Sequence, residues 1–92
     1  MRMGTLQLRK ILDEAPFGTI IEAYNRNGKN RMDIIFKKVD RDKTTKKWGV
    51  LQSWSSSRGW SSQHDDIMVY WNSREIINQF HDRIVFHGVE CQ

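Results

Sequence analysis

All four tryptophans of this chain fall between positions 48 and 71, and two of them bound a polar segment. That segment reads Trp54-Ser55-Ser56-Ser57-Arg58-Gly59-Trp60. An indole offers a large apolar face with one N–H donor, and an arginine beside a glycine can bring its guanidinium against an indole or a phosphate. Aromatic platforms combined with cationic side chains bind single-stranded nucleic acid. The segment therefore predicts a binding loop in which Trp54, Arg58 and Trp60 contact a partner.

Burial in the core is the alternative for three of the tryptophans. Strand alternation favours the core for Trp48, Trp54 and Trp71, since a small sheet needs bulky side chains. Trp60 differs because it stands in a polar context with no periodic partner. For Trp60, anchoring of the loop and contact with a partner stay equally open.

A strongly basic segment, residues 26–47, directly precedes the tryptophan-rich stretch. It holds nine Lys/Arg residues against three aspartates, in a chain of net charge +4. The basic residues are Arg26, Lys29, Arg31, Lys37, Lys38, Arg41, Lys43, Lys46 and Lys47. Along one sheet edge they would form a phosphate-contacting stripe, and each contact would add to the salt dependence of binding. The alternative is a solvated edge whose lysines prevent unwanted strand pairing.

The histidines and the cysteine do not form a metal or catalytic motif. His81, His87 and Cys91 lack the partners and the spacing of a structural zinc site. His64 precedes two aspartates and His81 precedes one, but adjacency in sequence does not create the oriented hydrogen bond that general-base catalysis needs. We expect a non-enzymatic protein that holds no metal and no cofactor.

The length of 92 residues fits one small domain, residues 1–92, with a thin core. No apolar run approaches the roughly 18 residues that a membrane span needs. The N-terminal residues lack the apolar stretch of a secretory signal. A single cysteine cannot form an internal disulfide, which favours a reducing compartment. The sequence predicts a cytoplasmic protein with no membrane partner.

The elements that must position these residues begin with a helix. Its apolar stripe, spaced i, i+3, i+4 and i+7, consists of Leu8, Ile11, Leu12 and Ala15. Thr5 is the expected N-cap, and Pro16 prevents the helix from continuing.

Three strands are expected next, at 17–24, 31–39 and 48–54, and they form a β-meander. The residues Asn25-Arg26-Asn27-Gly28 predict the first turn because Asn-Gly supplies the positive φ angles of a hairpin. Residues 40–47 form a polar connection. In the third strand, alternation places Trp48, Val50 and Trp54 on one face.

The last third of the chain predicts a loop, two strands and a short helix. Residues 55–66 are a loop by composition, and residues 67–71 a fourth strand. Asn72 and Glu75 have the spacing of a capping box, which opens the helix. Residues 83–89 are the last strand.

This order predicts an α+β fold. An N-terminal helix packs on a strongly bent antiparallel sheet, made of the β-meander and two further strands, with a short helix before the last strand. Such a sheet could close into an SH3-like or Sm-like partial barrel, an analogy that carries no function.

The leading hypothesis is a small cytoplasmic binding or regulatory protein that contacts RNA or single-stranded DNA through the basic hairpin of residues 26–47 and the Trp/Arg loop of residues 54–60. The alternative is a protein–protein interaction module, such as a phage- or plasmid-type inhibitor or adaptor. It would bind an acidic surface of a host protein, for example a nucleic-acid-processing or defence enzyme. Exposed Trp, Tyr and Arg side chains are enriched in interface hot spots. A homodimer through a sheet edge or through residues 67–71 is compatible with both hypotheses.

Overall fold

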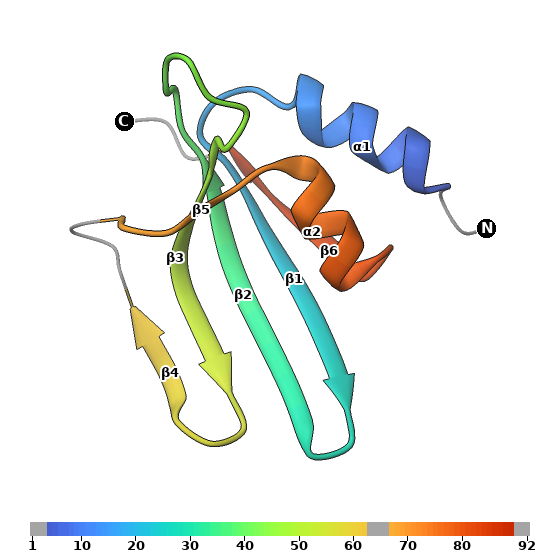
Figure 1. The fold of residues 1–92 in the computed structure, drawn as a ribbon, viewed down its shortest axis with the longest axis vertical. Helices are drawn as coiled ribbons and strands as arrows, with labels where there is room; N and C mark the ends of the chain where they lie inside the picture. The colour runs from blue at the N-terminus through green and yellow to red at the C-terminus, as the bar shows by residue number, and fades with distance from the viewer. Residues whose placement is uncertain (1–3, 63–66, 90–92) are drawn as a thin grey trace.

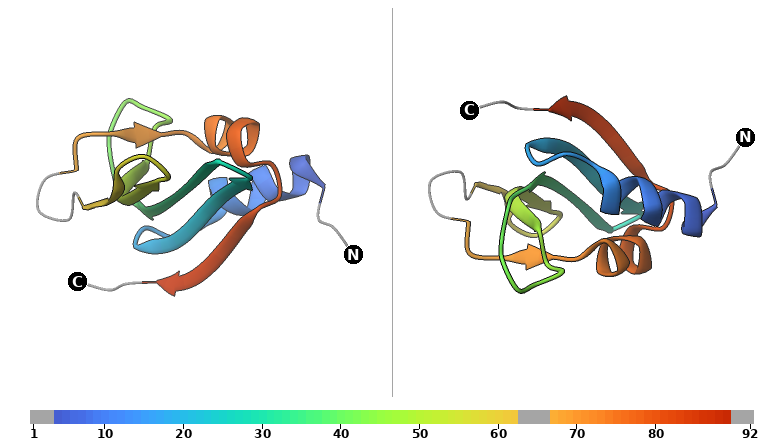
Figure 2. Two further views of the ribbon diagram at one scale, coloured as in Figure 1. Left: turned by 90° about the horizontal axis from the view of Figure 1, so that it is seen from below. Right: turned by 90° about the horizontal axis from the view of Figure 1, so that it is seen from above.

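The computed structural model describes residues 4–62 and 67–89, and its two helices lie on one side of an antiparallel sheet (Figure 1, Figure 2). In chain order the elements are α1 (Thr5–Glu14), β1 (Thr19–Asn27), β2 (Asn30–Lys38), β3 (Trp48–Ser55), β4 (Gly59–Ser62), β5 (Tyr70–Trp71), α2 (Ser73–Phe80) and β6 (Ile84–Val89). The predicted α+β arrangement is confirmed, with a helix first and a short helix before the last strand.

The strands follow the order β4-β3-β2-β1-β6, and each paired neighbour runs antiparallel. β5 pairs with the first residues of β3, whereas β4 pairs with the last residues of the same strand. The sheet is bent, as the end-on views of Figure 2 show. Among residues 4–62 and 67–89, the outer strands β4 and β6 do not pair with each other, so the sheet stays open and does not close into a barrel.

One face of the sheet is buried beneath the helices, because alternate side chains of a strand point to the same face. The strand residues of this helix-covered face that belong to the apolar core are Ile21 and Ala23 of β1, Ile34 and Phe36 of β2, and Trp48 and Val50 of β3. Leu8 and Leu12 of α1 complete the core together with Ile76, Ile77 and Phe80 of α2. The predicted apolar stripe of α1 is therefore confirmed for Leu8, Leu12 and the partly buried Ala15, whereas Ile11 is half-buried outside the core.

The two helices begin in different ways. The N-cap of α1 is Gly4, whose carbonyl accepts from the Leu8 N–H at 2.9 Å, so Thr5 already lies in the first turn and its predicted capping role is wrong. The capping box of α2 is confirmed. Asn72 Oδ1 accepts from the Glu75 N–H at 2.8 Å, and Glu75 Oε1 accepts from the Asn72 N–H at 3.1 Å.

The hairpin between β1 and β2 is tighter than the predicted four-residue turn. Asn27 pairs with Asn30, so only two residues connect the strands, and Gly28 takes the positive φ of 54° that the turn needs. Arg26 therefore lies within β1, where it pairs with Arg31 of β2.

β3 carries a bulge at Leu51. Phe36 of β2 pairs with Val50, whereas the preceding residue of β2 pairs with Gln52, which leaves Leu51 as the extra residue. The extra residue reverses the alternation beyond it. Trp54 therefore lies on the face opposite to Trp48 and Val50, and the prediction that these three share one face is wrong for Trp54.

The segment predicted as a loop contains strand β4. Gly59 pairs with Ser55 and Trp60 pairs with Trp54, so residues 56–58 form the turn and the loop prediction is wrong for residues 59–62. A φ of 74° at Gly59 helps the chain to reverse. Residues 63–66, the end of the predicted loop, lie outside the described residues.

The two C-terminal strands are shorter than predicted. The fourth predicted strand is limited to Tyr70 and Trp71, which pair with Gly49 and Trp48. Trp71 packs against the core, with its ring centroid 5.9 Å from that of Phe80. The core positions predicted for Trp48 and Trp71 are therefore confirmed.

Candidate functional site

The sheet face that the helices do not cover carries a row of aromatic residues. The side chains of this open face come from Ile20, Glu22, Tyr24 and Arg26 of β1, Arg31, Asp33, Ile35 and Lys37 of β2, Gln52 and Trp54 of β3, and Trp60 and Ser62 of β4. Successive cross-strand partners on it are Tyr24, Asp33, Trp54 and Trp60. Four strands therefore present one row, in which the carboxylate of Asp33 lies between Tyr24 and the two tryptophans.

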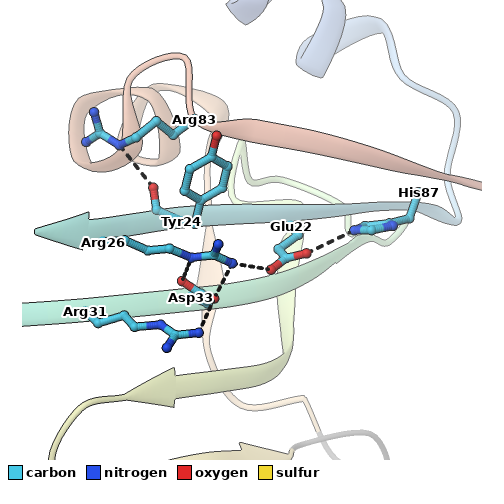
Figure 3. A network of polar contacts seen from close by, with 7 residues as sticks. All are labelled: Glu22, Tyr24, Arg26, Arg31, Asp33, Arg83 and His87. Carbon is cyan, nitrogen blue, oxygen red and sulfur yellow. Dashed lines mark hydrogen bonds and ion pairs between the residues drawn. The ribbon is translucent and has the colours of Figure 1, made fainter.

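Asp33 is the centre of this row. Its side chain is 2% exposed, and it accepts two hydrogen bonds from Arg26, at 3.3 Å from Nε and at 2.9 Å from Nη2 (Figure 3). Arg31 approaches the same carboxylate at 3.9 Å. The hydrogen bond and the charge of Asp33 raise the pKa of the Arg26 guanidinium above its ordinary value. A buried carboxylate thus holds two arginines whose side chains remain about half exposed.

The two arginines also lie against the rings of the row. The Arg31 guanidinium carbon is 4.4 Å from the centroid of the Trp54 ring, and that of Arg26 is 5.0 Å from the Tyr24 ring. Both distances are within the range of cation–π attraction. A guanidinium fixed between a carboxylate and a ring loses little further freedom when it binds a ligand.

Trp60 extends the aromatic surface toward the edge of the sheet. Its ring lies 6.5 Å from the Trp54 ring in an edge-on arrangement, and the residue is 50% exposed. An aromatic pair of this geometry gains about 0.5–1.5 kcal/mol beyond its area burial. Trp54 is half-buried and Trp60 exposed, so both present ring surface to solvent.

On the side of the row away from the β1–β2 hairpin, Glu22 of β1 makes polar contacts with β6 and with Arg26. His87 of β6 lies 3.2 Å from Glu22, and Glu22 is 3.7 Å from Arg26 (Figure 3). These contacts tie β6, β1 and β2 together across the open face.

Half of the predicted site residues lie at one end of the sheet. Arg26, Arg31, Trp54 and Trp60 share the open face, and Lys29 lies in the β1–β2 turn. Arg58 lies in the turn between β3 and β4, at the same end of the sheet as the β1–β2 hairpin (Figure 1). Four of the six therefore share the open face, and Lys29 and Arg58 lie in the two turns at the same end of the sheet.

Lys38 does not belong to that region, so its predicted role in phosphate contact is wrong. It is 5% exposed, and its Nζ donates to three carbonyl oxygens at the end of α1, those of Leu12 at 2.9 Å, Asp13 at 2.7 Å and Ala15 at 2.8 Å. The last carbonyls of a helix lack intrahelical partners, and this ammonium supplies them. Burial lowers the pKa of Lys38, an effect that the charge of Asp13 opposes.

The other predicted cations lie toward the opposite end, in or near the connection between β2 and β3 (Figure 1). Arg41 stacks 3.7 Å from the Tyr70 ring, Lys47 donates to the Arg41 carbonyl at 2.6 Å, and Lys46 pairs with Glu75 at 3.5 Å. Lys43 lies in the same connection. The predicted basic stripe along one sheet edge is therefore wrong, because β2 is an inner strand and its length separates the two groups of cations.

Two residues of the site were not predicted as binding residues. Tyr24 completes the aromatic row, and Asp33 holds the arginines. The signal for Tyr24 was present in the sequence, since Glu22, Tyr24 and Arg26 alternate along one strand and so share a face. The role of Asp33 depends on the register between strands, which the sequence does not specify.

The remaining histidines and acids do not come together as a metal site. Within the described ranges 4–62 and 67–89, no group of three or more His, Cys, Asp or Glu side chains is placed to hold a metal ion. His64, Asp65, Asp66 and Cys91, considered above, lie outside the described residues. Neither described helix is long and apolar enough to cross a membrane.

Comparison with protein-family models, with curated proteins and with solved structures found no match to this chain. The function is therefore inferred from the geometry of the open face.

Proposed function

We propose that this protein binds single-stranded nucleic acid, RNA or DNA, on the open face of its sheet. The observation that carries the proposal is the stacking of Arg31 on Trp54, 4.4 Å apart, beside the exposed ring of Trp60. Bases stack on aromatic rings and on guanidinium planes, and an aromatic sheet surface with nearby arginines supports such stacking.

Charge supports the same ligand. The chain carries a net charge of +4, and the residues of the turn regions 25–32 and 55–62 include Arg26, Lys29, Arg31 and Arg58 but no Asp or Glu. Cations at this end of the sheet attract a polyanion, and phosphate contacts release its bound counterions.

The exposure of these rings on one face favours an unpaired strand over a duplex. Tyr24, Trp54 and Trp60 come from β1, β3 and β4, and their side chains share the open face of the sheet. In a duplex the base faces are stacked on each other, so they are not accessible to such rings. We therefore expect higher affinity for unpaired oligonucleotides.

The proposed role is non-enzymatic and cytoplasmic. A single cysteine in 92 residues is usual for a protein of a reducing compartment. The binding surface acts by stacking and by charge, and these interactions need no cofactor.

Fluorescence anisotropy with labelled oligouridine, oligothymidine and a duplex of equal length tests the proposal over a range of salt concentrations. We expect binding of the single strands at low salt, with affinity that falls linearly on a logarithmic salt scale. Trp60→Ala should weaken that binding, whereas Met68→Ala, which changes an exposed apolar residue outside the row, should not. Absence of binding at low salt, or binding that salt does not weaken, would refute the proposal.

A protein partner is the second candidate function, and a different surface favours it. Phe86 and Val89 are 42% and 51% exposed on β6, an outer strand of the sheet, on the face opposite to the aromatic row. Exposed apolar side chains on an outer strand are typical of a surface that another protein covers. Capture from lysate treated with nuclease separates the two candidates, because a protein partner would persist and would depend on Phe86 and not on Trp60.

A further inference from the structure

The aromatic row runs across the strands. Tyr24, Asp33, Trp54 and Trp60 are successive cross-strand partners on β1, β2, β3 and β4. Adjacent strands lie about 4.8 Å apart, so the row from Tyr24 to Trp60 spans roughly 14 Å. A ligand that stacks on the whole row must therefore cross the sheet at a large angle to the strands.

The hairpin side of this row is cationic. Arg26 and Arg31 are cross-strand partners two residues nearer the β1–β2 turn, on the same open face. Lys29 lies in that turn, and Arg58 lies in the neighbouring turn between β3 and β4 (Figure 1). Arg26 and Arg31 therefore border the row on the open face, and the turns that hold Lys29 and Arg58 lie beyond them at the same end of the sheet.

The other side of the row is neutral or acidic. The next cross-strand set on the open face is Glu22, Ile35 and Gln52, which includes a carboxylate and no cation. Lys37 is half-buried and follows only two residues further along β2. A chain of phosphates on this side would pass the carboxylate of Glu22, which repels it.

From this asymmetry we propose how the strand is oriented on the open face, an inference that rests on the proposed function. The bound strand crosses β1 to β4 with its phosphates along the hairpin side, near Lys29 and Arg58, and with its bases over Tyr24, Trp54 and Trp60. With one base on each ring, the contact segment is about three nucleotides long. Arg26 and Arg31, held by Asp33, lie between the phosphates and the bases.

The orientation predicts which cations set the salt dependence. Each phosphate contact with a single strand contributes a slope of about −0.7 to the logarithmic plot of affinity against salt. Lys29→Ala combined with Arg58→Ala should therefore reduce the magnitude of the slope by about 1.4. Both residues are exposed in turns, so their replacement should leave the fold intact.

Two matched variants remove charge elsewhere. Lys43→Asn combined with Lys46→Ala removes two cations at the opposite end of the sheet, and asparagine tolerates the φ of 61° at position 43. Lys37→Ala removes the cation beyond Glu22, on the other side of the row. The proposed orientation predicts an unchanged slope for both.

The experiment measures these slopes by anisotropy with labelled oligothymidines from two to about eight nucleotides, a range chosen around typical site sizes. We expect affinity to rise steeply up to about three nucleotides and then only slowly, as further binding registers become available. A larger loss of slope for Lys37→Ala, or equal losses for the two double variants, would overturn the orientation while leaving single-strand binding established. A steep rise in affinity over the whole length series would overturn the three-base contact. If the wild-type chain binds no oligonucleotide at low salt, the proposed function fails, and this inference fails with it.

Discussion

The carboxylate of Asp33, almost fully buried on a face that no described helix covers, accepts two hydrogen bonds from Arg26. Buried carboxylates are rare unless they are paired, and here the pair lies at the centre of the proposed binding surface. The same carboxylate is 3.9 Å from Arg31, which stacks on Trp54. Asp33 therefore positions both arginines.

Replacement of Asp33 tests this positioning role. Asp33→Asn keeps the shape of the side chain but removes its charge, and we expect it to lower the free energy of unfolding by about 1–3 kcal/mol. Urea denaturation measures the change. Asp42→Asn, at an exposed position in the connection between β2 and β3, is the control and should change stability little. Equal stabilities for the two variants would contradict the role of Asp33.

Lys38 should contribute to stability and not to binding. Lys38→Met keeps much of the apolar stem but leaves the three carbonyls at the end of α1 without their donor, which should cost about 1–3 kcal/mol. Thermal or chemical denaturation measures the loss. The neighbouring variant Lys37→Met, on the opposite face of β2, should cost less. Oligonucleotide affinity per folded molecule should not change with Lys38→Met, and a marked loss of affinity would show that Lys38 contacts the ligand.

Trp60 should contribute to binding and little to stability. It is 50% exposed, so its removal leaves no internal cavity. Trp60→Ala should weaken single-strand binding by about 1–3 kcal/mol, the usual contribution of one base stacked on an aromatic ring. Trp60→Phe keeps a ring and should retain much of the affinity. Anisotropy measures both affinities. If Trp60→Phe binds as weakly as Trp60→Ala, a base does not stack on this ring.

Gly49 should not accept a side chain. A Cβ atom at this position would lie 2.7 Å from Cγ2 of Ile67 and 3.2 Å from the Tyr70 ring. Gly49→Ala should therefore destabilise the protein by about 1–3 kcal/mol, because the contacting segment must move away from β3. Gly4→Ala is the control: no atom lies within 4 Å of the added Cβ, so only the weaker N-cap of α1 is lost, and the cost should be smaller. Denaturation curves that coincide for the two variants would show that residues 67–70 can shift without cost.

Local patterns in the sequence specified the elements whose signal lies within a few residues. The apolar stripe of α1 and the Asn72–Glu75 capping box were both predicted and are both present. Each depends on spacings within one helical turn, where side chains meet whatever the rest of the fold does.

The positions of Trp54 and Trp60 could not be predicted in the same way. Uninterrupted alternation places Trp54 with Trp48, and only the bulge at Leu51 moves it to the open face. A bulge arises from the pairing of two strands and leaves no mark in the sequence of one. Trp60 has a partner, Trp54, only because Gly59 lets the chain turn back on β3. The serine-rich composition around it is equally compatible with a loop and with an edge strand.

The charge of Lys38 was misleading for a related reason. A count of lysines and arginines assigns the same meaning to each, yet Lys38 is buried beneath α1 while Lys29 and Arg58 are exposed at the turns. Its partners are more than twenty residues away in sequence. Tertiary contacts of this kind decide which cations remain available to a ligand.

The bulge at Leu51 also means that β3 can lose one codon without changing which face Trp54 occupies. Deletion of Leu51 would remove the extra residue, and Gln52, Ser53 and Trp54 would keep both their partners on β2 and their faces of the sheet. Substitutions at Leu51 keep the extra residue and so keep the same division of faces. In a lineage of such proteins, the surface around Trp54 would therefore tolerate both exchange and loss of the residue at position 51.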